Sequence, residues 1–258
     1  MRIHRRAKAL VVLSVLASHP FIPIGRVLAA RADGNPPEPA TALVQPKARL
    51  LEALRSKTPI EPIDIKEDPY LIWHGLEPPV APAGTVCGVR FERDQVHYRL
   101  ATFTQPEGAR TAGFSVTHFG ACGTCSTLQD LAVYLEKPDL TAPVRKCGFR
   151  LSRFASLTCL EDLKFSTACA RTWLYNLQNT RRQCLRVCLS SWLKGEAPTR
   201  QDGSLNACLQ CDEVRSGLVF KATAGRTRRN SGIRSSIPRL DAEIAPLVHD
   251  YVPGLPLR

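Results

Sequence analysis

Two short stretches of the chain hold residue types that could carry out chemistry. The first, HFGACGTCS, combines a histidine with two cysteines and a serine among small residues. In it, His118 could act as a general base, and Cys125 or Ser126 as a nucleophile. Gly120 and Gly123 would present backbone N–H groups at the start of a helix, which is a favourable place for an anion. We therefore predict the catalytic part of a site here.

The second stretch, AGRTRRNSG, is unusually rich in hydrogen-bond donors. Its arginines carry forked guanidinium groups suited to carboxylate, phosphate or sulfate. We predict that this loop, residues 225–232, closes over the first stretch to form a pocket for an anionic small molecule, with or without catalysis. The predicted ligand-binding residues of the loop are Arg226, Arg228, Arg229, Asn230 and Ser231.

The pair Cys122-x-x-Cys125 allows a second interpretation, thiol–disulfide exchange. A strand followed by ACGTCS at the start of a helix resembles the dithiol motif of thioredoxin-like proteins. In that motif the helix N-terminus lowers the pKa of the first cysteine and makes it an attacking thiolate. The resemblance implies a reducible Cys122–Cys125 pair, and the protein would then be a thiol–disulfide oxidoreductase.

A third interpretation is a non-catalytic secreted scaffold, either structural or for binding. In it each cysteine of the first stretch bridges elsewhere, His118 is a hydrogen-bonded internal histidine, and the arginine loop is solvated. A zinc site would need the second CxxC, Cys208-x-x-Cys211, but this lies more than eighty residues from the first. Zinc sites use closer spacings. We predict neither a metal nor another cofactor.

The chain contains ten cysteines, nine of them within residues 122–211. An even, clustered set in an exported protein is typical of a disulfide framework. The connectivity does not follow from the sequence. The disulfide candidates are Cys87, Cys122, Cys125, Cys147, Cys159, Cys169, Cys184, Cys188, Cys208 and Cys211.

Residues 1–30 have the three-part layout of a secretory signal peptide. A basic head, MRIHRRAK, precedes nine apolar residues, ALVVLSVLA, and then small residues with a plausible cleavage site near Ala29 or Ala30. Nine apolar residues are too few to span a bilayer, which takes about 20. We therefore expect a secreted protein, or one in another oxidising compartment outside the cytoplasm, with no stable membrane span after cleavage. An uncleaved anchor is the alternative.

The chain is strongly basic, with a formal net charge of +12. Removal of the five cations of the signal segment would leave +7. Residues 181–239 alone hold twelve Lys and Arg against four Asp and Glu. Such a local excess attracts anions, so we expect an anionic small molecule or a polyanion as partner. Nucleic acid is excluded by export and by the lack of a recognised binding motif. The oligomeric state does not follow from the sequence.

The proposed body of the protein, residues 85–258, follows a proline-rich arm, residues 31–84, that contains one short helix at 47–57. In the body, alternating apolar residues predict strands within 84–92, 94–104 and 111–119. The segment between the last two strands, QPEGAR, is expected to be a turn. Short connections favour an antiparallel meander.

The rest of the body has helical periodicity, with apolar residues three or four apart. We expect helices at 125–137, around 159–165 and at 166–195, then a short strand at 218–221 and a last helical turn that places His249 at the surface. Cys184 and Cys188 share one face of the longest helix. The predicted fold class is α+β, a small antiparallel sheet followed by a disulfide-stapled, mainly helical half.

Overall fold

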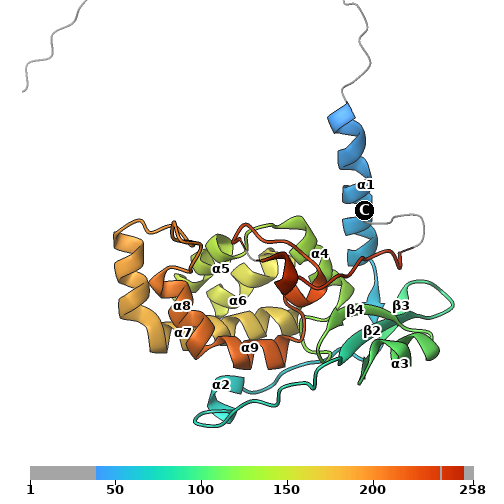
Figure 1. The fold of residues 1–258 in the computed structure, drawn as a ribbon, viewed down its shortest axis with the longest axis horizontal. Helices are drawn as coiled ribbons and strands as arrows, with labels where there is room; N and C mark the ends of the chain where they lie inside the picture. The colour runs from blue at the N-terminus through green and yellow to red at the C-terminus, as the bar shows by residue number, and fades with distance from the viewer. Residues whose placement is uncertain (1–38, 239, 253–258) are drawn as a thin grey trace, which may run out of the picture. The chain divides into compact units, whose positions relative to one another are not determined.

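The structure is a computed structural model that describes residues 39–238 and 240–252, with side chains from residue 47 onward. The predicted signal segment lies outside the described residues. A four-stranded sheet comes first in the chain and a mainly helical part follows, which confirms the α+β class. Figure 1 shows strands β2–β4 on one side and helices α5–α9 on the other.

The sheet is mixed, with the strand order β1-β3-β2-β4. β2 is antiparallel to both β3 and β4, whereas the short β1 is parallel to β3. The predicted meander is wrong, because β4 pairs with β2 and not with β3. The expected turn at 105–110 is instead a helix, α3, which carries the chain from β3 to the other side of β2. The bounds are β1 Thr58–Pro59, β2 Val86–Phe91, β3 His97–Phe103, α3 Pro106–Thr111 and β4 Ser115–Phe119.

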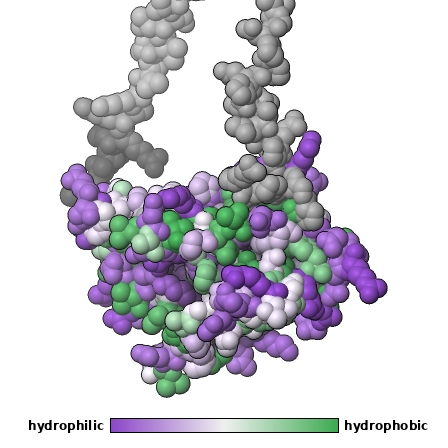
Figure 2. Space-filling view, turned by 45° about the vertical axis from the view of Figure 1, so that its right-hand side comes forward, coloured by the Kyte–Doolittle hydropathy of each residue, from purple (hydrophilic) through white to green (hydrophobic). Residues whose placement is uncertain are grey.

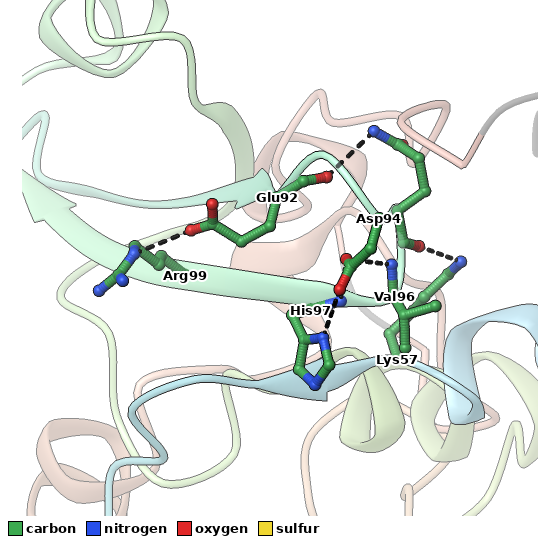
Figure 3. A network of polar contacts seen from close by, with 7 residues as sticks. Lys57, Glu92, Asp94, Val96, His97 and Arg99 are labelled. Atoms are coloured by element: carbon green, nitrogen blue, oxygen red, sulfur yellow. Dashed lines mark hydrogen bonds and ion pairs between the residues drawn. The ribbon is translucent and has the colours of Figure 1, made fainter.

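The turn between β2 and β3 is held by an exposed polar network (Figure 3). Asp94 Oδ1 accepts hydrogen bonds from the N–H groups of Val96 and His97, and its Oδ2 lies 2.6 Å from His97 Nδ1. The hydrogen bond with the His97 ring lowers the pKa of Asp94 to about 2. Lys57 donates to the Gln95 carbonyl at 2.6 Å, which fastens the start of β1 to this turn.

Helix α1, Pro39–Arg55, joins the proline-rich segment to the core. Leu50, Leu51 and Leu54 are buried in the same apolar cluster as residues of α4. Their helical spacing was the signal for this helix. An ion pair between Arg55 and Glu136 at 2.8 Å links the ends of α1 and α4.

Helix α4, Leu128–Glu136, begins at the N-cap Thr127, whose hydroxyl accepts the Asp130 N–H. Its Asp130 is fully buried and ties the start of α4 to the start of the longest helix. Asp130 accepts from the hydroxyl of Thr127 at 2.5 Å, and from the N–H and hydroxyl of Ser166 at 2.8 Å each. Burial raises the pKa of Asp130 to about 6.

The helical part contains three of the predicted helices and one segment that was predicted wrongly. The run 166–195 forms one helix, α7, and α6 includes most of the expected helix around 159–165. The expected strand at 218–221 is part of helix α9, because its apolar run follows α8 directly and packs on α7. The bounds are α2 Pro69–Ile72, α5 Thr141–Gly148, α6 Arg153–Asp162, α7 Thr167–Leu193, α8 Ala207–Arg215 and α9 Gly217–Ala224, with short 3-10 helices η1 Arg229–Ser231 and η2 Asp241–Glu243.

All ten cysteines form disulfides, which confirms the predicted framework. Two of the five bridges join α7 to α8, one ties β2 to the segment after β4, one ties that segment to α7, and one joins α5 to α6. Over the ranges that the structure covers, no helix is long and apolar enough to cross a membrane. The pairs are Cys87–Cys122, Cys125–Cys169, Cys147–Cys159, Cys184–Cys211 and Cys188–Cys208.

Candidate functional site

The two stretches singled out in the sequence lie against each other. The segment after β4 forms backbone hydrogen bonds to the end of α9, from Thr124 N–H to the Thr223 carbonyl at 3.0 Å and from Cys125 N–H to the Ala224 carbonyl at 2.9 Å. The two backbones can approach this closely because glycines face each other. A Cβ atom on Gly123 would lie 2.4 Å from the Thr223 carbonyl oxygen, and one on Gly225 would lie 2.5 Å from the Gly123 nitrogen.

Arg226 lies at the centre of this contact with none of its surface exposed. Its guanidinium donates five hydrogen bonds, three to backbone carbonyls and two to hydroxyls. The carbonyl acceptors are Thr117 at 3.0 Å, Cys125 at 3.1 Å and Ser126 at 3.0 Å, and the hydroxyl acceptors are Thr117 at 2.6 Å and Ser231 at 3.3 Å. A guanidinium has five N–H donors, so all of them are used inside the protein. We use the name arginine junction for Arg226 together with the residues that bind it or are hydrogen-bonded to one another around it. These residues are Thr117, His118, Cys125, Ser126, Ser231, His249 and Tyr251.

His118 and Ser126 form a hydrogen-bonded pair in the junction, and both are fully buried. His118 Nδ1 lies 2.9 Å from the Phe119 carbonyl oxygen, which only accepts, so Nδ1 carries the proton. Nε2 therefore accepts the Ser126 hydroxyl at 2.7 Å. The serine oxygen in turn accepts the Gly123 N–H at 2.8 Å. This is the hydrogen-bond order of a serine activated by a histidine base, with a backbone carbonyl in the orienting position.

Burial first, and the charge of Arg226 second, hold the pKa of His118 well below its usual value of 6.5. A histidine with so low a pKa stays neutral near pH 7, which is the state a general base requires. The same burial removes both side chains from solvent, so the geometry alone does not supply a reaction site.

His249 closes the junction from the C-terminal side and is only 4% exposed, so the expectation of a surface histidine is wrong. Its Nε2 donates to the Ser231 carbonyl at 2.9 Å, so its Nδ1 accepts the Tyr251 hydroxyl at 3.0 Å. Tyr251 accepts the Thr117 hydroxyl at 3.0 Å. The helical turn expected in residues 241–252 is present only as the 3-10 helix η2, Asp241–Glu243, and the chain around His249 has no regular secondary structure. Burial lowers the pKa of His249 to about 4.

The N–H groups that were expected to present an anion site are also used within the protein. Gly120 N–H donates to the Thr85 carbonyl at 2.7 Å, and Cys122 N–H donates to the Thr102 hydroxyl at 3.0 Å. With Gly123 bonded to the Ser126 hydroxyl, an anion would have to displace existing hydrogen bonds to bind here.

The other candidate residues of the loop point to different partners. Arg228 donates to the backbone carbonyls of Tyr134 and Lys137, and Arg229 forms ion pairs with Glu213 and Glu243. The Asn230 side-chain amide donates to the Phe119 and Gly225 carbonyls at 2.7 Å each, which fastens the loop to the end of β4. Of the three predicted arginines, only Arg226 therefore converges on His118.

The thiol–disulfide exchange interpretation is wrong, because Cys122 and Cys125 do not pair. Cys122 is bonded to Cys87 of β2, and Cys125 to Cys169 of α7. The stretch after β4 lies between two elements, and each cysteine bridges to the nearer one. Cys184 and Cys188 bridge one face of α7 to α8, as their spacing predicted.

Other features of the site were not identified from the sequence. Tyr251, Thr117 and Asp130 carry buried hydrogen bonds, but isolated hydroxyls and carboxylates give no local sequence signal. Two surface hollows of about 580 and 510 Å³ lie away from the junction, and Arg200 lines both. Within the ranges that the structure describes, no group of three or more His, Cys, Asp or Glu is placed to hold a metal ion.

Comparison with known proteins gives one partial match. The model of a family described as "Family of unknown function (DUF8771)" matches residues 153–247. This range begins with α6 and includes Arg226, but it excludes His118, Ser126 and the sheet. No curated protein and no solved structure matches the chain. The comparisons thus connect the helical part with a family whose function is itself unknown.

Proposed function

We propose that the protein acts after export, in an oxidising compartment, as a disulfide-stapled binding protein for an anionic partner. The partner presents phosphate, sulfate or carboxylate groups. It binds to exposed cations of the helical part, while the arginine junction serves as the internal support of the fold.

The five disulfides support the location. Structural disulfides persist outside the reducing cytosol, and small exported proteins use them to restrict the unfolded chain. The signal-like segment at residues 1–30 points to the same compartment.

The observation that carries the choice of partner is an excess of unpaired positive charge in the helical part. Residues 145–195 contain ten Lys and Arg but only two acidic residues. Of the ten, Arg171 and Arg182 form ion pairs, and both pair with the segment before β2. Among the residues that the structure describes, the other eight have no carboxylate within ion-pair distance. We call four exposed members of this set the cationic face: Arg145, Lys146, Arg150 and Lys194.

Figure 2 shows hydrophilic and hydrophobic residues interspersed over the face that it draws. Around the sheet, Arg99 pairs with Glu92 and Arg110 with Glu107, whereas Arg90 donates to the Ala112 carbonyl. Paired charges cancel at a distance, whereas a one-sign cluster raises the local concentration of anions.

The test is the binding of inorganic polyphosphate to the full chain with its disulfides intact. The variant R145Q/K146Q/R150Q/K194Q should bind at least tenfold more weakly, with a shallower dependence of log Kd on log salt, because fewer counterions are released. The matched control K47Q/R49Q/K66Q/R93Q removes the same charge from exposed sites elsewhere and should keep most of the affinity. Equal losses in the two variants would show that net charge alone, and not this face, is responsible.

A further inference from the structure

The connection between α5 and α6 exposes large apolar side chains to solvent. Phe149 is 67% exposed, Phe154 is 78% exposed and Leu151 is completely exposed at 106%. All three lie within residues 149–154, and the same six-residue stretch also contains two cations, Arg150 and Arg153. An exposed apolar residue is common on its own, but a concentrated group of them marks an interaction surface.

The exposed end of α7 extends this apolar group. The rings of Phe149 and Trp192 are in contact, with centroids 6.4 Å apart, so the α5–α6 connection and the end of α7 form one continuous surface. Trp192 is 57% exposed, and Leu193 and Leu189 beside it are also exposed. We call Phe149, Leu151, Phe154 and Trp192 the apolar edge.

The cationic face borders this apolar edge in the chain. Arg145 and Lys146 lie in the last turn of α5, four and three residues before Phe149, and Lys194 follows Trp192 by two residues. The arrangement therefore combines protruding Phe, Leu and Trp side chains with adjacent Arg and Lys and no paired carboxylate.

We propose that this surface binds the headgroup region of a bilayer that contains anionic lipids. The cations meet the lipid phosphates, and the apolar edge enters the boundary between headgroups and acyl chains. This inference rests on the proposed function, because it takes the cationic face as the binding surface and identifies the anion as a lipid phosphate. Tryptophan and phenylalanine beside Lys and Arg are the residues that favour this boundary in membrane-bound proteins.

Two other occupants fit these residues less well. A soluble polyanion would use the cations but would leave Phe149, Leu151 and Phe154 in water. A second copy of this chain would cover the apolar residues but would bring two unpaired cationic faces together, which costs free energy through like-charge repulsion. A lipid surface satisfies both features at once.

The experiment measures binding of the purified chain, disulfides intact, to vesicles of phosphatidylcholine with and without 30% phosphatidylglycerol, a fraction chosen as roughly that of a moderately anionic membrane. Every variant carries the same N-terminal residues, so differences between variants report on the substituted side chains. The wild type should bind the anionic vesicles and bind pure phosphatidylcholine at least tenfold more weakly. The variant R145Q/K146Q/R150Q/K194Q should lose about 600-fold in affinity for anionic vesicles, since each of its four cations contributes about fivefold near the surface.

The variant F149S/L151S/F154S tests the apolar edge separately. It should lose at least tenfold in vesicle affinity while its affinity for polyphosphate changes less than twofold. The matched control L71S/L76S/V80S removes three apolar residues that are similarly exposed elsewhere, and it should bind like the wild type. Lipids brominated in the acyl chain should quench tryptophan emission, and the change should be lost in Trp192→Phe.

Each remaining outcome overturns a stated part. Polyphosphate binding without vesicle binding would overturn the lipid inference and leave the proposed function standing. A wild type that bound neither polyphosphate nor anionic vesicles would overturn the proposed function and the lipid inference together. A wild type that is dimeric by sedimentation, with a monomeric F149S/L151S/F154S variant, would show that a second copy covers the apolar edge and would overturn the lipid inference.

Discussion

The arginine junction and the cationic face use the same residue type in opposite ways. In the junction one buried guanidinium satisfies carbonyls and hydroxyls from three segments, and none of its donors is left for a ligand. On the cationic face, four exposed cations have no carboxylate partner and remain accessible. The difference teaches that an arginine-rich sequence does not identify a binding site, since burial and partners decide what each arginine can do.

The largest expected effect comes from the buried side of this comparison. Arg226→Met should lower the free energy of unfolding by about 3–5 kcal/mol, because three buried carbonyls and two hydroxyls lose their donor. Urea denaturation at pH 7 measures it. The variant R145Q/K146Q/R150Q/K194Q should stay within about 0.5 kcal/mol of the wild type, as exposed substitutions usually do. An Arg226→Met protein of normal stability that no longer bound polyphosphate would reverse the assignment of the two regions.

A second prediction concerns the acid stability of the junction. The pKa of His249 is about 4 in the folded protein and 6.5 is its ordinary value, so the unfolded chain takes up the proton first. The contribution of neutral His249 is fully present above pH 6.5 and is lost as the pH falls towards 4, an effect of about 3 kcal/mol. His118 acts in the same direction. The pKa of Asp130 is raised to about 6 in the folded protein, so protonation of Asp130 stabilises the fold as the pH falls and offsets part of this loss.

A comparison of the wild type with the variant His249→Gln isolates the contribution of His249 to the pH dependence of stability. Glutamine can still donate to the Ser231 carbonyl and accept from Tyr251, but it does not titrate. Urea midpoints measured from pH 7.5 to 4.5 should fall less steeply in the variant. Parallel pH profiles would show that His249 is not the group that titrates.

The smallest expected effect is at the histidine–serine pair. Ser126→Ala leaves the buried Gly123 N–H without its acceptor and should cost about 1–2 kcal/mol. A fluorophosphonate that reacts with activated serines should leave the folded protein unlabelled, because both side chains are inaccessible. Labelling at Ser126 that disappears in His118→Ala would contradict the purely internal role and would make the junction a reaction site.

The sequence predicted those elements whose pattern is local and repeated. The long helix was expected at 166–195 and is found at Thr167–Leu193. The helix expected at 125–137 is found at Leu128–Glu136. Alternation around Tyr98 correctly located β3. In each case a face is buried against the core, so the burial period is visible in the sequence.

The errors arose where the outcome depends on distant contacts. The apolar run at 218–221 fits either a strand or a buried helix, and its packing on α7 decided for the helix. The pairing of β4 with β2 depends on the path through α3, which periodicity does not report. For the candidate site, proximity of Arg226 to His118 agrees with the expected meeting of the two stretches, but no sequence pattern showed that carbonyls would use all five donors.

The junction also sets the time at which this protein can finish folding. The carbonyls of Thr117 and Ser126 accept hydrogen bonds from Arg226. Thr117 precedes Arg226 by 109 residues in the chain, and Ser126 precedes it by 100. A ribosome therefore releases the strand β4 and the start of α4 long before their internal cation is made. A chain that passes through a secretion channel from its N-terminus would reach the far side with this centre incomplete, and the centre would close only after Arg226 and Ser231 had crossed.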